Sequence, residues 1–245
     1  MGKIECRMLA IAVALAAMLL FLNGCCAQND AVSLRSYSSS DGYYTVSLPE
    51  SWKVDGFKCS GITAQDISNP ARGLSYLSKL HEGFVVLPAG VTPESYLENY
   101  MPQDFSLGGN DVHDMRIIGY EEPSFYNNLD VLSLLSGASL TSIPTSTKAM
   151  RCSFTVNGTP AEGSFVIRTK NLYGYGTQIE YLLGIYSPAD QFDIDTPMLL
   201  GAFNSAKFNP AYRNICMPVG GGDDCHICLD NQCCSHVCNA NGKCN

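Results

Sequence analysis

Seven cysteines near the C-terminus are the densest group of reactive side chains in this chain of 245 residues. Thiols at such short spacing either join as disulfides or bind zinc. The 30 residues that hold them contain almost no aliphatic side chains, so this segment cannot bury enough apolar surface to fold unaided. The sequence therefore predicts a small disulfide-stapled module over residues 214–245, joined through Gly220-Gly221-Gly222. Its cysteines are Cys216, Cys225, Cys228, Cys233, Cys234, Cys238 and Cys244.

The choice between disulfides and zinc depends on the compartment. Zinc is the alternative because Cys225-His226-Ile227-Cys228 forms a close ligand pair and His236 lies near. Export into an oxidising space favours disulfides, so we expect no metal and no other cofactor. The adjacent Cys233-Cys234 with the cysteines after it resembles knottin-type spacing. Because seven is odd, one tail cysteine must stay free, pair with Cys26 or the main domain, or bridge two molecules.

Export is indicated by the N-terminus, where Lys3 and Arg7 precede an apolar run from Met8 to Leu22. That run is shorter than the ~20 residues that a membrane-spanning helix needs. It leads into Leu22-Asn23-Gly24-Cys25, which resembles the lipobox of bacterial and archaeal lipoproteins. The resemblance implies cleavage after Gly24 and a diacylglyceryl group on Cys25, which would anchor the chain stably. The alternative is an ordinary secretory signal cleaved near Ala27.

Two further cysteines and one asparagine are candidate sites in the central part of the chain. Cys59 and Cys152 are disulfide candidates, with two separately buried thiols as the alternative. Asn157-Gly158-Thr159 is a possible N-glycosylation sequon at Asn157. The same Asn-Gly pair favours a two-residue type I′ hairpin turn, which is the interpretation we prefer.

Catalysis is not expected. The sequence contains no phosphate-binding Gly-rich loop, nucleophile elbow or His-Glu-x-x-His motif. Outside the tail the histidines are His81 and His113, each with a carboxylate close in sequence. Either could act as a base, but an exposed histidine beside an acid is common, and the geometric demands of a real site are strict.

The elements that must position these residues are mostly strands. Residues 44–48 alternate in polarity, Pro49 interrupts the pattern, and Trp52 and Val54 resume it. Helix starts are expected at Thr92-Pro93 and Thr196-Pro197, and a capping box at residues 187–190. Further strands are expected at residues 150–156, 179–185 and 206–208.

The hairpin after the 150–156 strand has a predictable register, because a two-residue turn at Asn157-Gly158 sets every pair. Small residues then mostly face bulky ones. The expected pairs are Val156 with Thr159, Phe154 with Ala161, Cys152 with Gly163 and Met150 with Phe165.

The stretch from about residue 43 to residue 210 resembles the PsbP-like group of α/β sandwiches. The resemblance rests on Tyr44-Thr-Val-Ser-Leu-Pro-Glu-Ser-Trp52, on Tyr186-Ser-Pro-Ala-Asp-Gln-Phe192, and on Ser205-Ala-Lys-Phe208. It implies an α+β fold for residues 42–213, with a curved antiparallel sheet flanked by short helices, and a mostly non-catalytic accessory role. Before it we expect a signal peptide over residues 1–24 and a lipidated, flexible tether over residues 25–41.

The net charge of the chain limits the classes of molecule that it can bind. After removal of residues 1–24, 13 basic and 22 acidic side chains leave a net charge of −9, which disfavours nucleic acid. We therefore expect an exported, lipid-anchored envelope protein on the outer face of the membrane, a non-enzymatic module that binds a protein, glycan or small ligand. The alternatives are an extracellular hydrolase-type enzyme and a structural spacer.

Overall fold

A curved antiparallel sheet of seven strands is the main element of the computed structural model. The structure describes residues 33–40, 42, 44–56, 61–80, 87–106, 109–122, 144–172 and 176–209, with residues 232–233 and 236–237 beyond them. The strand order is β3-β4-β5-β9-β8-β7-β6, and each neighbouring pair is antiparallel. The strands are β3 (Trp52–Gly56), β4 (Gly61–Asp66), β5 (Gly73–Leu80), β6 (Val112–Glu121), β7 (Thr145–Val156), β8 (Thr159–Asn171) and β9 (Thr177–Pro188).

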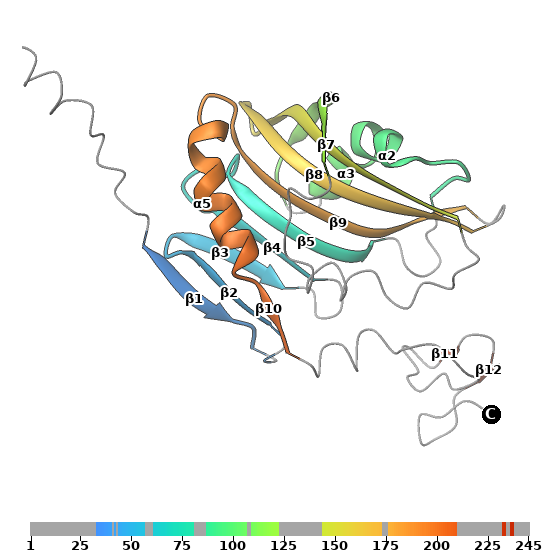
Figure 1. Cartoon of the computed structure of the whole chain (residues 1–245), viewed down its shortest axis with the longest axis horizontal. Helices are drawn as coiled ribbons and strands as arrows, with labels where there is room; N and C mark the ends of the chain where they lie inside the picture. The colour runs from blue at the N-terminus through green and yellow to red at the C-terminus, as the bar shows by residue number, and fades with distance from the viewer. Residues whose placement is uncertain are drawn as a thin grey trace, which may run out of the picture. The chain divides into compact units, whose positions relative to one another are not determined.

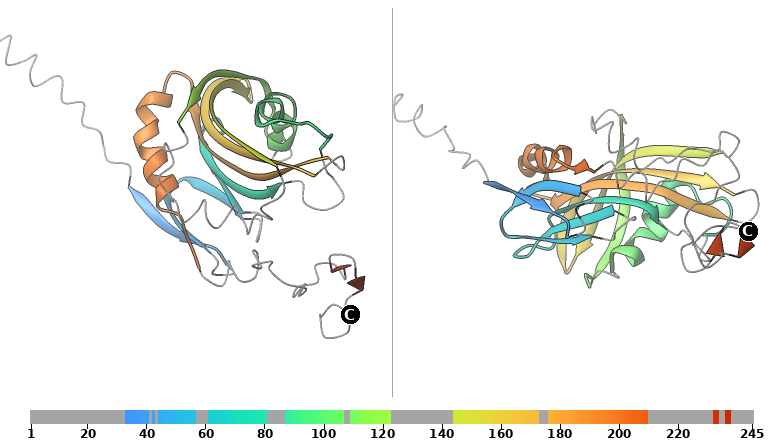
Figure 2. Two further views of the ribbon diagram at one scale, coloured as in Figure 1. Left: turned by 45° about the vertical axis from the view of Figure 1, so that its right-hand side comes forward. Right: turned by 90° about the horizontal axis from the view of Figure 1, so that it is seen from below.

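A smaller sheet and three helices complete this part of the chain (Figure 1). Strands β1 (Leu34–Ser38), β2 (Tyr44–Pro49) and β10 (Lys207–Phe208) form the small sheet, with β2 in the middle. Helix α5 (Phe192–Asn204) lies on one face of the large sheet, and helices α2 (Pro93–Asn99) and α3 (Met101–Ser106) lie within its curve (Figure 2). The expected α+β class, an antiparallel sheet flanked by short helices, is confirmed.

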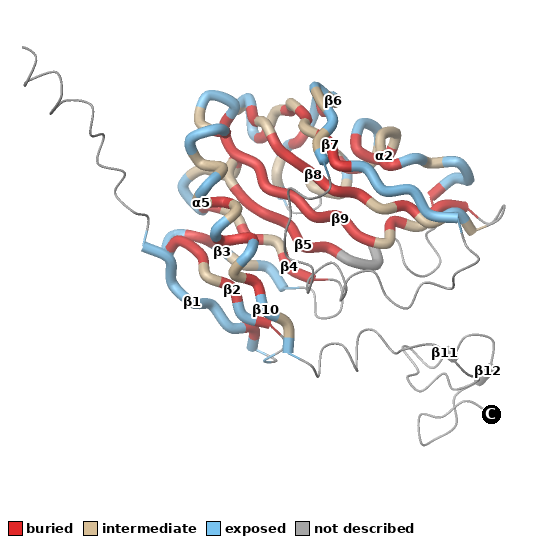
Figure 3. The backbone as a smooth tube through the Cα atoms, viewed as in Figure 1, coloured by how far each residue is buried: buried red, intermediate tan, exposed pale blue. Residues whose placement is uncertain are grey.

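Each face of the large sheet carries a separate apolar core, because successive strand residues point to opposite faces. On β9, Leu183 and Ile185 join the core beneath α5 and β2, whereas Leu182 joins the core beneath α2 and α3. Burial on both faces explains why the central strands contain long apolar runs, as the buried positions along β9 and β5 show (Figure 3).

The β7–β8 hairpin has the expected register. The pairs Met150–Phe165, Cys152–Gly163, Phe154–Ala161 and Val156–Thr159 are all present. Asn157 and Gly158 have φ angles of 50° and 81°, the left-handed values that a type I′ turn requires. Turn chemistry and alternation were therefore sufficient to define this hairpin.

Three local expectations were wrong. Residues 34–38 were assigned to the tether but form β1, whose Tyr37 ring stacks on Tyr44. By contrast, helix α2 begins at Pro93 with Thr92 as its N-cap, as expected, and ends at Asn99; α3 follows it, with Pro102 in its first turn, where no amide hydrogen is needed.

Helix α5 starts before Thr196-Pro197, at Phe192, with Gln191 as its N-cap. Ser187, expected in a capping box, lies at the end of β9, and its hydroxyl instead bonds to Asp195. The Thr196 hydroxyl donates to the Phe192 carbonyl across 2.6 Å, and Pro197 follows within α5, so Thr196-Pro197 belongs to the interior of the helix and not to its start.

In the tail, β11 (Gln232–Cys233) pairs with β12 (His236–Val237). Cys25, Cys59 and the tail cysteines other than Cys233 lie outside the described residues. The predicted roles of all these cysteines, including Cys233, stay predictions. Within the described part of the chain, no helix is both long and apolar enough to cross a membrane.

Candidate functional site

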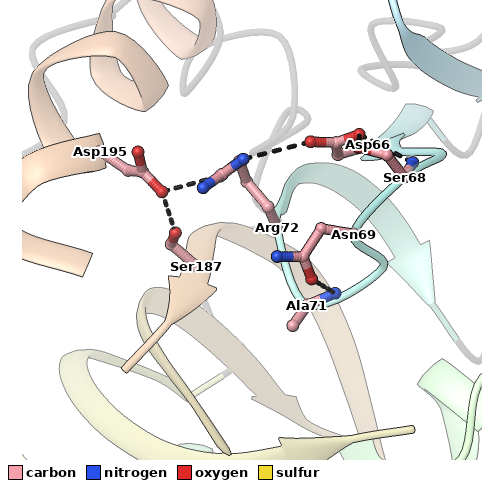
Figure 4. A network of polar contacts seen from close by, with 7 residues as sticks. All are labelled: Asp66, Ser68, Asn69, Ala71, Arg72, Ser187 and Asp195. Atoms are coloured by element: carbon pink, nitrogen blue, oxygen red, sulfur yellow. Dashed lines mark hydrogen bonds and ion pairs between the residues drawn. The ribbon is translucent and has the colours of Figure 1, made fainter. Parts of the chain in front are cut away.

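Figure 4 shows a network of polar contacts in which Arg72 joins two carboxylates. Its Nε donates to Oδ2 of Asp195 across 2.7 Å, and its Nη1 donates to Oδ2 of Asp66 across 3.2 Å. The Ser187 hydroxyl donates to the same oxygen of Asp195. We call Asp66, Arg72, Ser187 and Asp195 the Arg72 clamp.

Local turn chemistry presents Arg72 to its partners. Between β4 and β5, Asp66 Oδ1 accepts from the Ser68 amide at 2.9 Å, and Asn69 Oδ1 accepts from the Ala71 amide at 3.2 Å. These short side chains bond to the backbone two residues on, which shapes the loop. The Arg72 amide closes the loop by donating to the Asn69 carbonyl at 2.9 Å. The clamp therefore joins the β4–β5 loop to the first turn of α5.

A second arginine holds the same turn of α5. Arg151 on β7 donates to Glu162 Oε2 across 2.7 Å and to Asp193 Oδ1 across 3.0 Å. Its guanidinium carbon also lies 4.8 Å from the centre of the Phe192 ring. Acidic residues in the first turn suit the positive end of the helix dipole, and here Arg72 from the β4–β5 loop and Arg151 from β7 bind them as well.

The clamp is built to hold position and is poorly suited to catalysis. The carboxylates of Asp66 and Asp195 are occupied by Arg72, and Ser187 is fully buried with its proton directed to Asp195. A nucleophile needs an available base and access to a substrate. The arrangement instead fixes the surface around it, where Ile67 and Ile194 are each 68% exposed.

Sequence reasoning missed this site. Asp66 and Arg72 sit in an ordinary loop pattern, and Asp195 lies 123 positions from Arg72. One signal was available: Ile194 is an apolar residue between two acids, Asp193 and Asp195, at a helix start. In the structure this residue is 68% exposed, beside the Asp195 carboxylate that binds Arg72.

The candidate catalytic histidine that the structure describes is exposed. His113 Nδ1 lies 2.8 Å from Asp114 Oδ2, with the two side chains 48% and 71% exposed. Among the described residues, Asp114 is the one side chain that the His113 ring contacts by a hydrogen bond, so no nucleophile is joined to this pair. His81 lies outside the described residues.

Cys152 is a free, fully buried thiol, so the expected disulfide is wrong for this residue and the buried-thiol alternative holds. Its side chain points into the core beneath α2 and α3. Burial raises the pKa of the Cys152 thiol well above its ordinary value, because the thiolate would lose its hydration.

We expect Cys152 to resist a thiol reagent in the folded protein and to react once denaturant is added. Peptide mapping separates it from the other cysteines. Ser153→Cys is a matched control, because the neighbouring position on β7 faces the opposite side and is partly exposed, so it should react in the folded state. Rapid native labelling of Cys152, or its recovery in a disulfide-linked peptide, would contradict the assignment.

A β-bulge places one more titratable group on the sheet. Between Arg168 and Thr169 on β8, the register shifts so that Glu180 on β9 is the extra residue. Its Oε2 lies 2.9 Å from Arg168 Nε. Burial raises the pKa of the Glu180 carboxyl, and the charges of Arg168 and Lys170 oppose that rise. The pair joins neighbouring strands, and we assign it a structural role.

Comparisons with known proteins find distant similarity in structure alone. No protein-family model matches the chain, and no curated protein matches it. Among solved structures, the chain is similar to the solution structure of cyanobacterial PsbP (CyanoP) from Synechocystis sp. PCC 6803. The match has 12% sequence identity and a TM-score of 0.33, and it covers 75% of this chain and 97% of that chain.

Proposed function

We propose that this chain is an exported, lipid-anchored module that binds a partner outside the membrane and catalyses no reaction. The exported location is supported by the signal-like N-terminus and the motif that ends at Cys25. The finer interpretation as a PsbP-like accessory module, with a knottin-like tail, belongs to the same proposal.

One observation carries the binding role. Ile67 directly follows Asp66, and Ile194 directly precedes Asp195, so each exposed isoleucine is next to a carboxylate that holds Arg72. Because the clamp fixes both backbone segments, binding of a partner over these side chains would cost this chain little conformational entropy. Exposed apolar side chains on a rigid frame are typical of interface anchors.

Photo-cross-linking in the native host tests this role. A photoreactive residue in place of Ile194 should give a discrete adduct, whereas the same residue in place of Tyr120 on β6, which is 66% exposed, should give none. The control matches exposure and differs in location. Equal adducts from both positions, or none from Ile194, would contradict a partner at the clamp, and the absence of any adduct would favour the spacer alternative.

The same cells test the anchor. The wild-type chain should fractionate with membranes, and Cys25→Ala should not, because the thiol that receives the lipid is gone. Loss of the Ile194 adduct in Cys25→Ala would show that anchoring is needed to reach the partner. Membrane association unchanged by Cys25→Ala would exclude the lipid anchor.

A further inference from the structure

The turn of the β7–β8 hairpin is tied to the start of β6 by an amide clamp. Asn157 Oδ1 accepts from the Asp111 amide at 2.8 Å, and Asn157 Nδ2 donates to Asn110 Oδ1 at 3.0 Å. The Asn157 amide donates to the Asp111 carbonyl at 2.8 Å. Asn110 Nδ2 in turn donates to Gln65 Oε1 at 3.4 Å. Both ends of the Asn157 side chain are therefore held.

Asn-Gly is the dipeptide in which an asparagine side chain is most easily attacked by the next backbone nitrogen. The Gly158 nitrogen loses its proton and bonds to Cγ of Asn157, the bond from Cγ to Nδ2 breaks, and ammonia leaves. Water then opens the succinimide ring to give aspartate or isoaspartate at this position. Water is the only co-reactant, and no oxidant or reductant is needed.

Steric shielding does not protect this turn. Asn157 is exposed, and a β carbon added to Gly158 would meet no atom within 4 Å. The attack makes Cγ tetrahedral and expels Nδ2, so the bond from Nδ2 to Asn110 has to break, and the bond from Oδ1 to Asp111 restricts rotation of the side chain. These hydrogen bonds are therefore what opposes the attack.

We infer that Asn157 is a site of spontaneous deamidation and that Asn110 and Asp111 suppress the reaction in the folded chain. The modification would also loosen the hairpin. A carboxylate at position 157 cannot donate to Asn110, and it would place a negative charge beside Asp111. The clamp thus preserves both the chemistry of the turn and its attachment to β6.

The test uses the full mature chain with Asn110→Ala, incubated at mildly alkaline pH and analysed by peptide mapping for aspartate and isoaspartate at position 157. Loss of one net hydrogen bond should raise the rate by several-fold to about tenfold. Asn110→Asp keeps an acceptor for Nδ2 and should stay close to the wild-type rate. Asn99→Ala, which removes an exposed bond within α2, is the matched control and should leave the rate unchanged.

Two references make the outcome decisive. Asn241-Gly242 is the second Asn-Gly pair of the mature chain, and its rate of deamidation should be the same in every variant. The urea-unfolded chain gives the rate at Asn157 without any clamp. Circular dichroism must show that Asn110→Ala is folded; if it is not, the comparison of wild type with Asn110→Asp and the unfolded chain decides. A folded wild type that reacts as fast as the unfolded chain, or a folded Asn110→Ala that reacts no faster than wild type, would overturn the inference.

Discussion

Arg72→Met should lower the free energy of unfolding by about 3 kcal/mol or more, because removing one partner of a buried ion network leaves uncompensated charge. The Asp66 and Asp195 side chains are only 7% and 15% exposed. Ser68 and Ser187 still donate to them, which limits the loss. Urea unfolding of the mature chain measures the effect.

An exposed ion pair provides the control for Arg72. Lys53 and Asp55 lie 2.9 Å apart with side chains 63% and 51% exposed, so Lys53→Met should cost less than about 1 kcal/mol. Arg72→Lys should recover at most part of the stability that Arg72→Met loses, since one ammonium cannot reproduce the planar, two-pronged hydrogen bonding of a guanidinium. Combining Arg72→Met with Asp195→Ala should be less damaging than the sum of the single changes. Equal costs for Arg72→Met and Lys53→Met would refute the structural role of the clamp.

Gly184→Ala should cost about 2–3 kcal/mol through overpacking. A β carbon at this position on β9 would overlap the ring of Phe165, the residue opposite it on β8. Phe165 is fully buried, and its ring centre lies 6.2 Å from those of Phe105 and Phe154, so it has little room to move. Thermal or urea unfolding reports the loss.

Gly119→Ala is the matched control for Gly184→Ala, because a β carbon there would meet nothing within 4 Å and the residue lies on the edge strand β6. Its cost should stay within about 0.5 kcal/mol. Adding Phe165→Leu to Gly184→Ala should recover part of the stability that the ring overlap removes. If Gly119→Ala and Gly184→Ala lower the free energy of unfolding equally, overlap with the Phe165 ring is not the reason for glycine at position 184.

We expect the Arg72 clamp and the close packing of Gly184 against Phe165 to keep the domain rigid. The proposed binding role requires such rigidity. If Arg72→Met also abolishes the adduct at position 194 while the protein stays folded, the position of the first turn of α5 matters for the partner. The two arginines come from different places in the chain, Arg151 from β7 and Arg72 from the loop before β5, so each can be tested separately.

The sequence by itself determined the elements whose signals are local. The β7–β8 hairpin followed from Asn157-Gly158 and strict alternation, and the start of α2 followed from Thr92 and Pro93. In each, the deciding interactions join residues only a few positions apart, so they can be recognised without knowing the fold.

Only the tertiary structure decided the rest. Ser187 carries a capping signature, yet its hydroxyl bonds to Asp195, because β9 continues through position 188. Cys152 was compatible with a bridge or a buried thiol until the core around it was known. Arg72 and Asp195 meet across 123 positions, and Gly184 is needed only because Phe165 lies opposite it. These features depend on which strands become neighbours, and strand order arises from burying two sheet faces at once rather than from any short segment.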